Sequence, residues 1–529
     1  MKHLPSLITM TLILLSGCGQ KESKPSCSTQ SLTLNMLSEP QTLNPTRARA
    51  LADINVIKMV GEGLMRLDKQ GTPQPALATS VDISSDAMTY TFTLRDAKWS
   101  NGQPVTSDDF IYAWKMSLRP DYPSDNAYLL YTIKHAQQIK KGRLPSSLLG
   151  VEAPDAHHLI IRLSRPTPYF LELLAHPIYF PLPKQIAAQD PHWADRGESY
   201  VGCGPFTIET WNHNDTITLA KNHLYWDQSA VKLDTVTLSM VPEETGLKLF
   251  EMKELDCEGS PFSTLPTDAL PALQSSGRLQ MEPLCGTCWM RLNVDRTPLS
   301  SPSIRKALAL AINREEILTH VTHNTLMPAP GIVPGSLNLH PSPLMGDGNK
   351  EEAKRLFTQG CKELGLKPKK FPPISLVYAM TDRNHKIAQA IQGQWKETLG
   401  VDITLSQVES KVAFSLISHQ EYDIALGNWI ADVNDPISFL EVFASKTNGT
   451  NNTGWESPEY ASLLTRSFFA ASSEERFDLL RQSEQILMEE MPVIPIYTFT
   501  MCYIQSPDVE DIAVSKLGSI DIKSARRVR

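Results

Sequence analysis

The stretch KIAQAIQGQWKETLGVDITL, residues 386–405, places a helix pattern, a turn residue and a strand pattern in direct succession. Residues 386–399 repeat apolar side chains at the spacing of a buried helix face, namely Ile387, Ala390, Ile391, Trp395 and Leu399. Gly400 follows where a helix commonly ends in a left-handed conformation, which glycine adopts at least cost. Val401–Leu405 then alternates apolar and polar residues, as a half-buried strand does. This succession predicts α/β architecture.

The same alternation of helix and strand patterns recurs along the chain. Thr89–Arg95 puts Tyr90, Phe92 and Leu94 on one face of a predicted strand. Ser301 and Pro302 are a helix N-cap and a first-turn proline, and Ser472 with Glu475 forms a capping box for a second helix. Further strands are predicted at residues 32–37, 159–163, 217–219, 236–240, 289–294 and 422–429.

Length and charge bound the class of protein. A chain of 529 residues exceeds what one hydrophobic core serves, so about three structural units are expected. The 50 Lys and Arg residues against 58 Asp and Glu residues give a formal net charge of −8. This acidic balance argues against a nucleic-acid partner, which requires clustered basic residues.

The first residues predict the compartment. Residues 1–17 hold one lysine near the start, an apolar stretch Leu7–Leu15 and then small residues, as in a secretory signal peptide. Leu15–Cys18 (LSGC) resembles a bacterial lipobox, in which the cysteine is lipidated and becomes the new N-terminus. We expect Cys18 to anchor the protein to a membrane on the extracytoplasmic side, in the periplasm or on the outer face of the cell membrane. Residues 18–30 then form a flexible tether.

The other cysteines and the histidines indicate no catalytic or metal chemistry. Cys285 and Cys288 have CxxC spacing without a second such pair, which favours a structural disulfide or buried thiols over a redox or zinc site. His157 and His158 are adjacent beside a strand pattern, so they point to opposite faces and suit no shared metal. Signatures such as GxSxG, HExxH and the Walker A loop are missing from the sequence. We expect no enzyme, cofactor or metal.

Several motifs occur in a recognisable order. They are residues 37–45 (LSEPQTLNP), 60–64 (VGEGL), 90–114, 202–227, 293–317, 394–401 (QWKETLGV), 428–440 (NWIADVNDPISFL) and 491–497 (MPVIPIY). Together they resemble the extracytoplasmic solute-binding proteins of peptide ABC transporters, the oligopeptide- and dipeptide-binding family. The resemblance extends over nearly all of the chain after residue 17.

The resemblance implies a two-lobe periplasmic-binding-protein fold, or Venus flytrap, with an extra subdomain inserted in the first lobe. The implied first lobe comprises residues 31–61, 190–285 and 500–529, the inserted subdomain 62–189, and the second lobe 286–499. Such proteins capture short peptides between the lobes and deliver them to the permease and ATPase subunits of an importer. We expect a monomer.

The resemblance also implies the site. In the family, the aspartate at Asp432 meets the peptide's α-ammonium group, whereas Asp435 precedes Pro436 as a helix N-cap and is left out of the site. Asn428 accompanies Trp429 in the same motif. Candidate walls of the cleft are Trp429, Tyr497, Phe499, Tyr128 and Tyr131.

The first lobe is expected to contribute the segment Thr46–Leu51, including Ala50 and Leu51. Its Arg47 and Arg49 are candidates for a peptide carboxylate. Oligopeptide binders can carry an arginine three residues before the tryptophan, where this chain has Leu426. That difference leaves the preferred peptide length open.

The sequence is compatible with alternative functions. Within the family, the ligand could be a cell-wall muropeptide, a dipeptide, or a nickel or haem complex. From a different class, an extracytoplasmic peptidase would consume its ligand, and a chaperone would lack a closed cleft.

Overall fold

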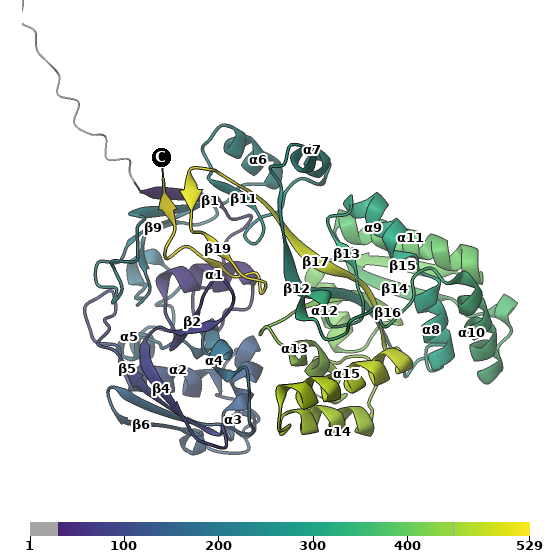
Figure 1. Cartoon of the computed structure of the whole chain (residues 1–529), viewed down its shortest axis with the longest axis horizontal. Helices are drawn as coiled ribbons and strands as arrows, with labels where there is room; N and C mark the ends of the chain where they lie inside the picture. The colour runs from purple at the N-terminus through teal and green to yellow at the C-terminus, as the bar shows by residue number, and fades with distance from the viewer. Residues whose placement is uncertain (1–29, 448, 529) are drawn as a thin grey trace, which may run out of the picture.

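The structure is a computed structural model that describes residues 30–447 and 449–528. The predicted signal peptide 1–17, Cys18 and all of the tether except Gln30 lie outside the described residues. Figure 1 shows two lobes side by side, with two long strands running from one to the other. The first lobe contains the purple and blue N-terminal part together with the yellow C-terminal end, and the second lobe is green.

One mixed sheet runs through both lobes. Its strand order is β15-β14-β16-β12-β17-β11-β1-β10-β9-β8, with β13 paired to β17. In the second lobe these strands are β13 (Met327–Pro328), β14 (Ile374–Ala379), β15 (Ile403–Val408) and β16 (Ile424–Ile430). In the first lobe they are β1 (Ser31–Asn35), β8 (Phe206–Asn212), β9 (Thr216–Lys221), β10 (Thr235–Ser239) and β11 (Cys257–Gly259).

The two strands that cross between the lobes are β12 (Gln280–Leu292) and β17 (Val493–Gln505). They pair antiparallel from Gln280 to Arg291 of β12, with register breaks between Pro283 and Thr287 and between Cys288 and Trp289. Proline cannot donate to a sheet ladder, and a bulge of this kind accommodates it. Two paired crossing strands permit the lobes to open and close as a hinge does.

The first lobe holds a second sheet. Its order is β4-β5-β7-β6, made of β4 (Ala78–Ile83), β5 (Thr89–Leu94), β6 (Val151–Asp155) and β7 (His158–Arg162). The helices of this lobe are α1 (Leu51–Val60), α2 (Ser107–Ser117), α3 (Ala136–Lys140), α4 (Phe170–Leu173), α5 (Lys184–Gln189), α6 (Glu243–Glu251) and α7 (Leu270–Ser275). Short two-stranded pairs are β2 (Met65–Leu67) with β3 (Pro73–Pro75), β18 (Val509–Glu510) with β21 (Arg526–Arg527), and β19 (Ala513–Val514) with β20 (Ile520–Asp521).

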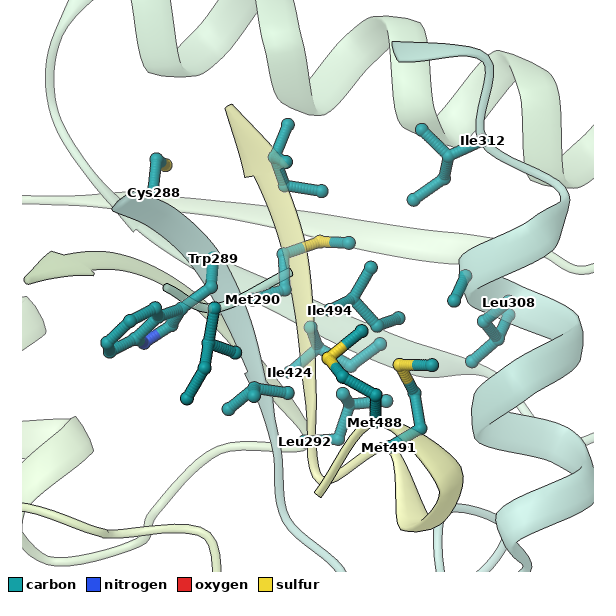
Figure 2. Close-up of a cluster of buried hydrophobic side chains, with 14 of the residues drawn as sticks. Cys288, Trp289, Met290, Leu292, Leu308, Ile312, Ile424, Met488, Met491 and Ile494 are labelled. Carbon is teal, nitrogen blue, oxygen red and sulfur yellow. The ribbon is translucent and has the colours of Figure 1, made fainter. Parts of the chain in front are cut away.

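The second lobe is built from helices around its part of the sheet. These are α8 (Pro302–Leu310), α9 (Arg314–Thr322), α10 (Lys350–Glu363), α11 (Asp382–Leu399), α12 (Ser410–Ser418), α13 (Ile437–Leu440), α14 (Pro458–Ser467) and α15 (Ser473–Glu490). Figure 2 shows Trp289 beside β12, with Leu308 and Ile312 beyond the neighbouring strand β17. Trp289 and Met290 are adjacent in β12 and point to opposite faces, and both are fully buried, so both faces of β12 are covered here.

Local sequence signals account for several of these elements. The Ser301 hydroxyl accepts a hydrogen bond from the Ile304 N–H, as predicted for an N-cap. Helix α11 begins one turn earlier than its apolar pattern, because Thr381 caps it through the Asn384 N–H. Gly400 ends that helix with a φ of +68°, which confirms its predicted left-handed conformation.

The buried apolar side chains gather in three large clusters. One lies in the second lobe, and two lie in the first lobe, around β1 and α1 and around the β4–β7 sheet. Val433, from the loop that follows β16, joins the cluster around the β4–β7 sheet. The lobes are therefore in apolar contact with each other. The division into residue ranges stays a prediction, and two of its boundaries, at 285/286 and 499/500, fall within β12 and β17.

Gly400 and Gly393 provide a matched pair for testing the end of α11. A Cβ on either would meet no described atom within 4 Å, so backbone conformation alone decides the effect. We expect Gly400→Ala to lower the free energy of unfolding by about 1 kcal/mol, because alanine is strained at positive φ. Gly393→Ala, inside the helix, should raise it by about 0.5–1 kcal/mol. Urea denaturation followed by circular dichroism measures both, and changes of the same sign would contradict the assignment.

Candidate functional site

A cavity of about 740 Å³ lies between the two lobes. This volume is within the usual range for small-molecule sites. From the first lobe it is lined by Arg49, Leu51, Ile54, Lys58, Tyr128 and Glu172. From the second lobe it is lined by Arg291 on β12, by Phe414 on α12 and by the end of β16. Both lobes therefore contribute to one site.

Strand β16 forms a wall of this cavity with an open edge. Seven consecutive residues, 426–432, line the cavity. On one side β16 pairs with β12 along its whole length. On the other side its pairing with β14 covers only Ile424 and Ala425. In the described part of the chain no strand pairs with residues 426–430 on that side, so their backbone groups are available to a ligand.

Asp432 follows β16 at the end of this open edge. Its carboxylate accepts a hydrogen bond from the Tyr128 hydroxyl of the first lobe at 2.7 Å. Its backbone N–H donates to the Ser438 hydroxyl at 3.0 Å. Burial raises the pKa of Asp432 to about 6, despite the opposing effect of the hydrogen bond from Tyr128. A neutral hydroxyl is thus the partner of this carboxylate, where a cation would stabilise its charge far better.

Asp435 has a structural role, as predicted, although α13 begins at Ile437 with Pro436 as its N-cap, one residue later than the sequence indicates. Its carboxylate accepts a hydrogen bond from the Ile437 N–H at 2.9 Å, at the start of α13. It also pairs with Arg476 through two hydrogen bonds of 2.8 Å each. The two aspartates of this loop therefore have different roles, since Asp435 holds the loop in place and Asp432 faces the cavity.

Further contacts hold the lobes together beside the cavity. The Glu172 carboxylate accepts a hydrogen bond from the Asn434 N–H. Burial raises the pKa of Glu172 to about 7. Arg165 pairs with Glu441 and lies over the Phe468 ring, with its guanidinium carbon 3.7 Å from the ring centroid. The structure therefore represents a closed arrangement of the lobes.

The predicted site residues fall into two groups. Those lining the cavity are Asp432, Trp429, Asn428, Tyr128 and Leu51, and Leu426 joins them. The lining does not include Ala50, which caps α1, or Tyr131, which packs against the core around the β4–β7 sheet. Nor does it include Tyr497 and Phe499 on β17, whose rings contact each other with centroids 5.1 Å apart. Tyr497 is 2% exposed, so the core of the second lobe contains it.

The two arginines of the first-lobe segment differ. Arg49 lines the cavity, pairs with Asp125 at 3.3 Å and lies 4.6 Å from the centre of the Phe414 ring across the cleft. Arg47 is exposed and outside the lining.

Sequence reasoning missed several residues of the cavity. Lys58 donates a hydrogen bond to the Ser519 hydroxyl at 2.8 Å, and burial lowers its pKa to about 8. Glu172 and His176 also line the cavity, and burial lowers the pKa of His176 to about 3. Arg291 did have a signal, because it is a charged residue within an apolar run, residues 289–294 (WMRLNV).

The cysteines and histidines that the structure describes can be compared with the predicted alternatives. The six described cysteines are free, including Cys285 and Cys288, so the interpretation of buried thiols holds and that of a disulfide does not. Residues three apart on a strand point to opposite faces, too far apart for an S–S bond. His158 contacts Asp155, and residues 30–447 and 449–528 contain no cluster suited to a metal ion. None of the helices within those ranges is long and apolar enough to span a membrane.

Comparison with known families agrees with this geometry. The family described as "Bacterial extracellular solute-binding proteins, family 5 Middle" matches residues 72–451. The chain belongs to this family. The family is a class of solute-binding proteins, and the two-lobe α/β fold seen here is also that of the similar solved structures.

Family members with similar sequences and structures cover nearly the whole chain. The oligopeptide-binding protein OppA of Bacillus subtilis is 38% identical over 99% of both chains. The dipeptide-binding protein DppE of Bacillus subtilis is 34% identical, covering 93% of this chain and 91% of its own. The murein tripeptide-binding protein MppA of Escherichia coli superposes with a TM-score of 0.84 at 28% identity, over 95% and 99% of the two chains. Haemophilus influenzae OppA, solved in complex with the peptide RPPGFSPFR, gives 0.82 at 27% identity over the same shares.

The carboxyl groups between the lobes predict that closure without ligand depends on pH. Opening returns Asp432 and Glu172 to water, where the pKa of each falls towards 4. The closed form, with a pKa of about 6 for Asp432 and about 7 for Glu172, therefore binds protons more tightly. Unliganded closure should be most favourable near pH 4 and should be lost as pH rises through 6 and 7.

Small-angle X-ray scattering of the ligand-free protein between pH 4 and 8 measures this effect as a rise in the radius of gyration. The double variant D432N/E172Q cannot ionise at these positions, so the rise of its radius between pH 4 and 7 should be smaller than in the parent protein. An equally steep dependence in the double variant would contradict the assignment.

Proposed function

We propose that the protein is the substrate-binding component of an ABC importer, which captures short peptides in the cavity between its lobes. It then delivers them to the permease and ATPase subunits in the membrane. Lobe closure, without catalysis, is the mechanism. The names of relatives such as OppA and DppE, which specify oligopeptides and dipeptides, support this proposal. The observation that carries it is the Asp432 carboxylate, which lies at the end of an open strand edge and pairs with no cation among the described residues.

The open edge of β16 suits a peptide backbone. A peptide in extended conformation can add to a sheet edge as a further strand, through main-chain hydrogen bonds that do not depend on its sequence. Residues 426–430 present such an edge to the cavity. Binding at this edge is therefore compatible with many different peptides.

Asp432 suits the peptide's α-ammonium group. A charged ammonium donates short hydrogen bonds to a carboxylate, and in a closed cleft both charges would be costly without each other. The Tyr128 hydroxyl already donates to one carboxylate oxygen, at 2.7 Å, and helps to orient the group. The ammonium would bind the ionised carboxylate, so peptide binding lowers the pKa of Asp432 from about 6.

The size and lining of the cavity suit varied side chains. A volume of about 740 Å³ leaves room for water beside a peptide. Bridging waters can satisfy different polar side chains nearly as well as direct contacts. Trp429 and Phe414 provide apolar surface within the same lining.

We also propose that Cys18 carries a lipid anchor on the extracytoplasmic side of the membrane and that the body acts as a monomer. The sequence LSGC at residues 15–18 supports the anchor. In cells, the Cys18→Ser variant should appear in the soluble fraction, whereas the parent protein should partition with membranes and carry the mass of the lipid. Membrane partitioning of the serine variant equal to that of the parent would contradict the anchor.

The role of Asp432 predicts discrimination between free and blocked amino termini. Asp432→Asn should weaken binding of free-amine peptides by about 2–5 kcal/mol, because it removes one partner of a buried charge pair. Isothermal titration with a peptide set and its N-acetylated counterparts measures the difference. Asp125→Asn, which removes a cavity carboxylate already paired with Arg49, is the matched control and should leave the discrimination intact. Equal affinity of the parent protein for acetylated and free peptides would reject the assignment.

A further inference from the structure

Arg291 is a buried cation that pairs with no anion among the residues the structure describes. It lies in β12 and is 6% exposed, between Met290 and Leu292, which are fully buried. Within residues 30–447 and 449–528, no group accepts a hydrogen bond from its guanidinium, and its buried Nε has no partner. Its Cζ lies 5.4 Å from the centroid of the Trp289 ring. This cation–π contact is weaker than an ion pair with a carboxylate would be.

The other deeply buried arginines show what a satisfied one looks like in this protein. Arg305 donates to the backbone carbonyls of Leu299, Ser300, Glu490 and Met491. Arg314 pairs with Asp347 and donates to backbone carbonyls. Arg476 donates two hydrogen bonds to Asp435, although its Nε also lacks a partner. Arg291 is the exception, and leaving a buried charge unpaired is costly.

Arg291 lies in the wall of the cavity between the lobes. Arg291 lies opposite Ala425 in the β12–β16 ladder, so Gly427 is its diagonal neighbour on the same face. A Cβ on Gly427 would meet the Arg291 Nη1 atom at 2.7 Å. The guanidinium therefore lies where a side chain of residue 427 would stand. Arg291 and Gly427 both line the cavity.

The carboxylates within the cavity do not supply the missing anion. Asp125 pairs with Arg49, Glu172 accepts from the Asn434 N–H, and Asp432 accepts from Tyr128. The anion that satisfies Arg291 must therefore come from outside the described chain.

We propose that Arg291 is the receptor for a carboxylate of the bound ligand. On the function proposed above, on which this inference rests, that carboxylate is either the C-terminus of the peptide or an acidic side chain within it. The planar guanidinium suits a carboxylate because it can donate two parallel hydrogen bonds. The same proposal explains why an apolar strand contains this charge, because the carboxylate of the ligand would be the ion-pair partner of the guanidinium.

The spacing of the two charged groups bears on peptide length. The Arg291 guanidinium lies beside Gly427, and Asp432 comes five residues later in the chain, two residues beyond the end of β16 at Ile430. Five strand steps of about 3.4 Å each span at most roughly 17 Å. An extended peptide of roughly four to six residues covers this distance, so one peptide can meet both charges.

Arg291→Met tests the proposal with two readouts. The variant should bind a carboxylate-bearing peptide about 10- to 100-fold more weakly, because charge-assisted hydrogen bonds are lost. The ligand-free variant should unfold at the same temperature as the parent or higher, because an unpaired buried charge has been replaced by an apolar side chain. Arg291→Lys keeps the charge without the planar fork and should retain part of the affinity.

Arg305→Met is the matched control for a buried arginine. It removes donors from backbone carbonyls, so it should lower the unfolding temperature without changing the order of peptide affinities. The comparison of Arg305→Met with Arg291→Met therefore distinguishes a structural arginine from a ligand-binding one. If Arg305→Met folds poorly, the peptide affinity of Arg291→Lys still tests the proposal.

Four peptides of alanine and leucine, made at lengths of three to six residues, distinguish the sources of the carboxylate. One has a free C-terminus, one a C-terminal amide, one an amide with a central glutamate, and one an amide with a central glutamine. A loss confined to the first assigns Arg291 to the C-terminus, and a loss confined to the third assigns it to an acidic side chain. Unchanged affinities in Arg291→Met, or an equal loss for all four peptides, would overturn the proposal. Failure of the parent protein to bind any of them would overturn the proposed function instead, and this inference with it.

Discussion

The pairing of β12 with β17 is the constraint on which the rest of the structure depends. These two strands are the part of the sheet that belongs to both lobes, so they hold the lobes together and leave them one main motion. β16 pairs with β12 along its whole length, and this pairing positions β16 at the edge of the cavity. The position of Asp432 after β16, and that of Arg291 on β12, both follow from this arrangement. Strand β12 thus belongs both to the hinge and to the binding wall.

The cavity combines two charged groups that no oppositely charged side chain in the described part of the chain neutralises. Asp432 has a hydroxyl as its partner, and Arg291 has an aromatic ring. A ligand that carries an ammonium and a carboxylate would satisfy both and would favour the closed form, in which each group is buried. Affinity would then reside mainly in groups that every unblocked peptide has. The open edge of β16 extends this tolerance to the backbone between them.

Local patterns predicted local structure well. Helix 386–399, Gly400 and the capping at Ser301 follow from propensity and periodicity, which act within a few residues. The full length of β12 was not predicted, because Pro283 and Gly286 interrupt the apolar pattern and only pairing across the sheet makes the strand continuous. Asp432 and Tyr128 were placed in one site through the resemblance to a family. The unpaired state of Arg291 depends on which groups meet across the sheet, and spacing along the chain does not reveal that.

The most direct test of the central claim is mass spectrometry of the ligand released when the protein, purified from cells, is denatured. We expect short peptides with free amino and carboxyl ends, enriched at lengths of roughly four to six residues. Recovery of a sugar, a haem or a metal complex, with no peptide, would contradict it.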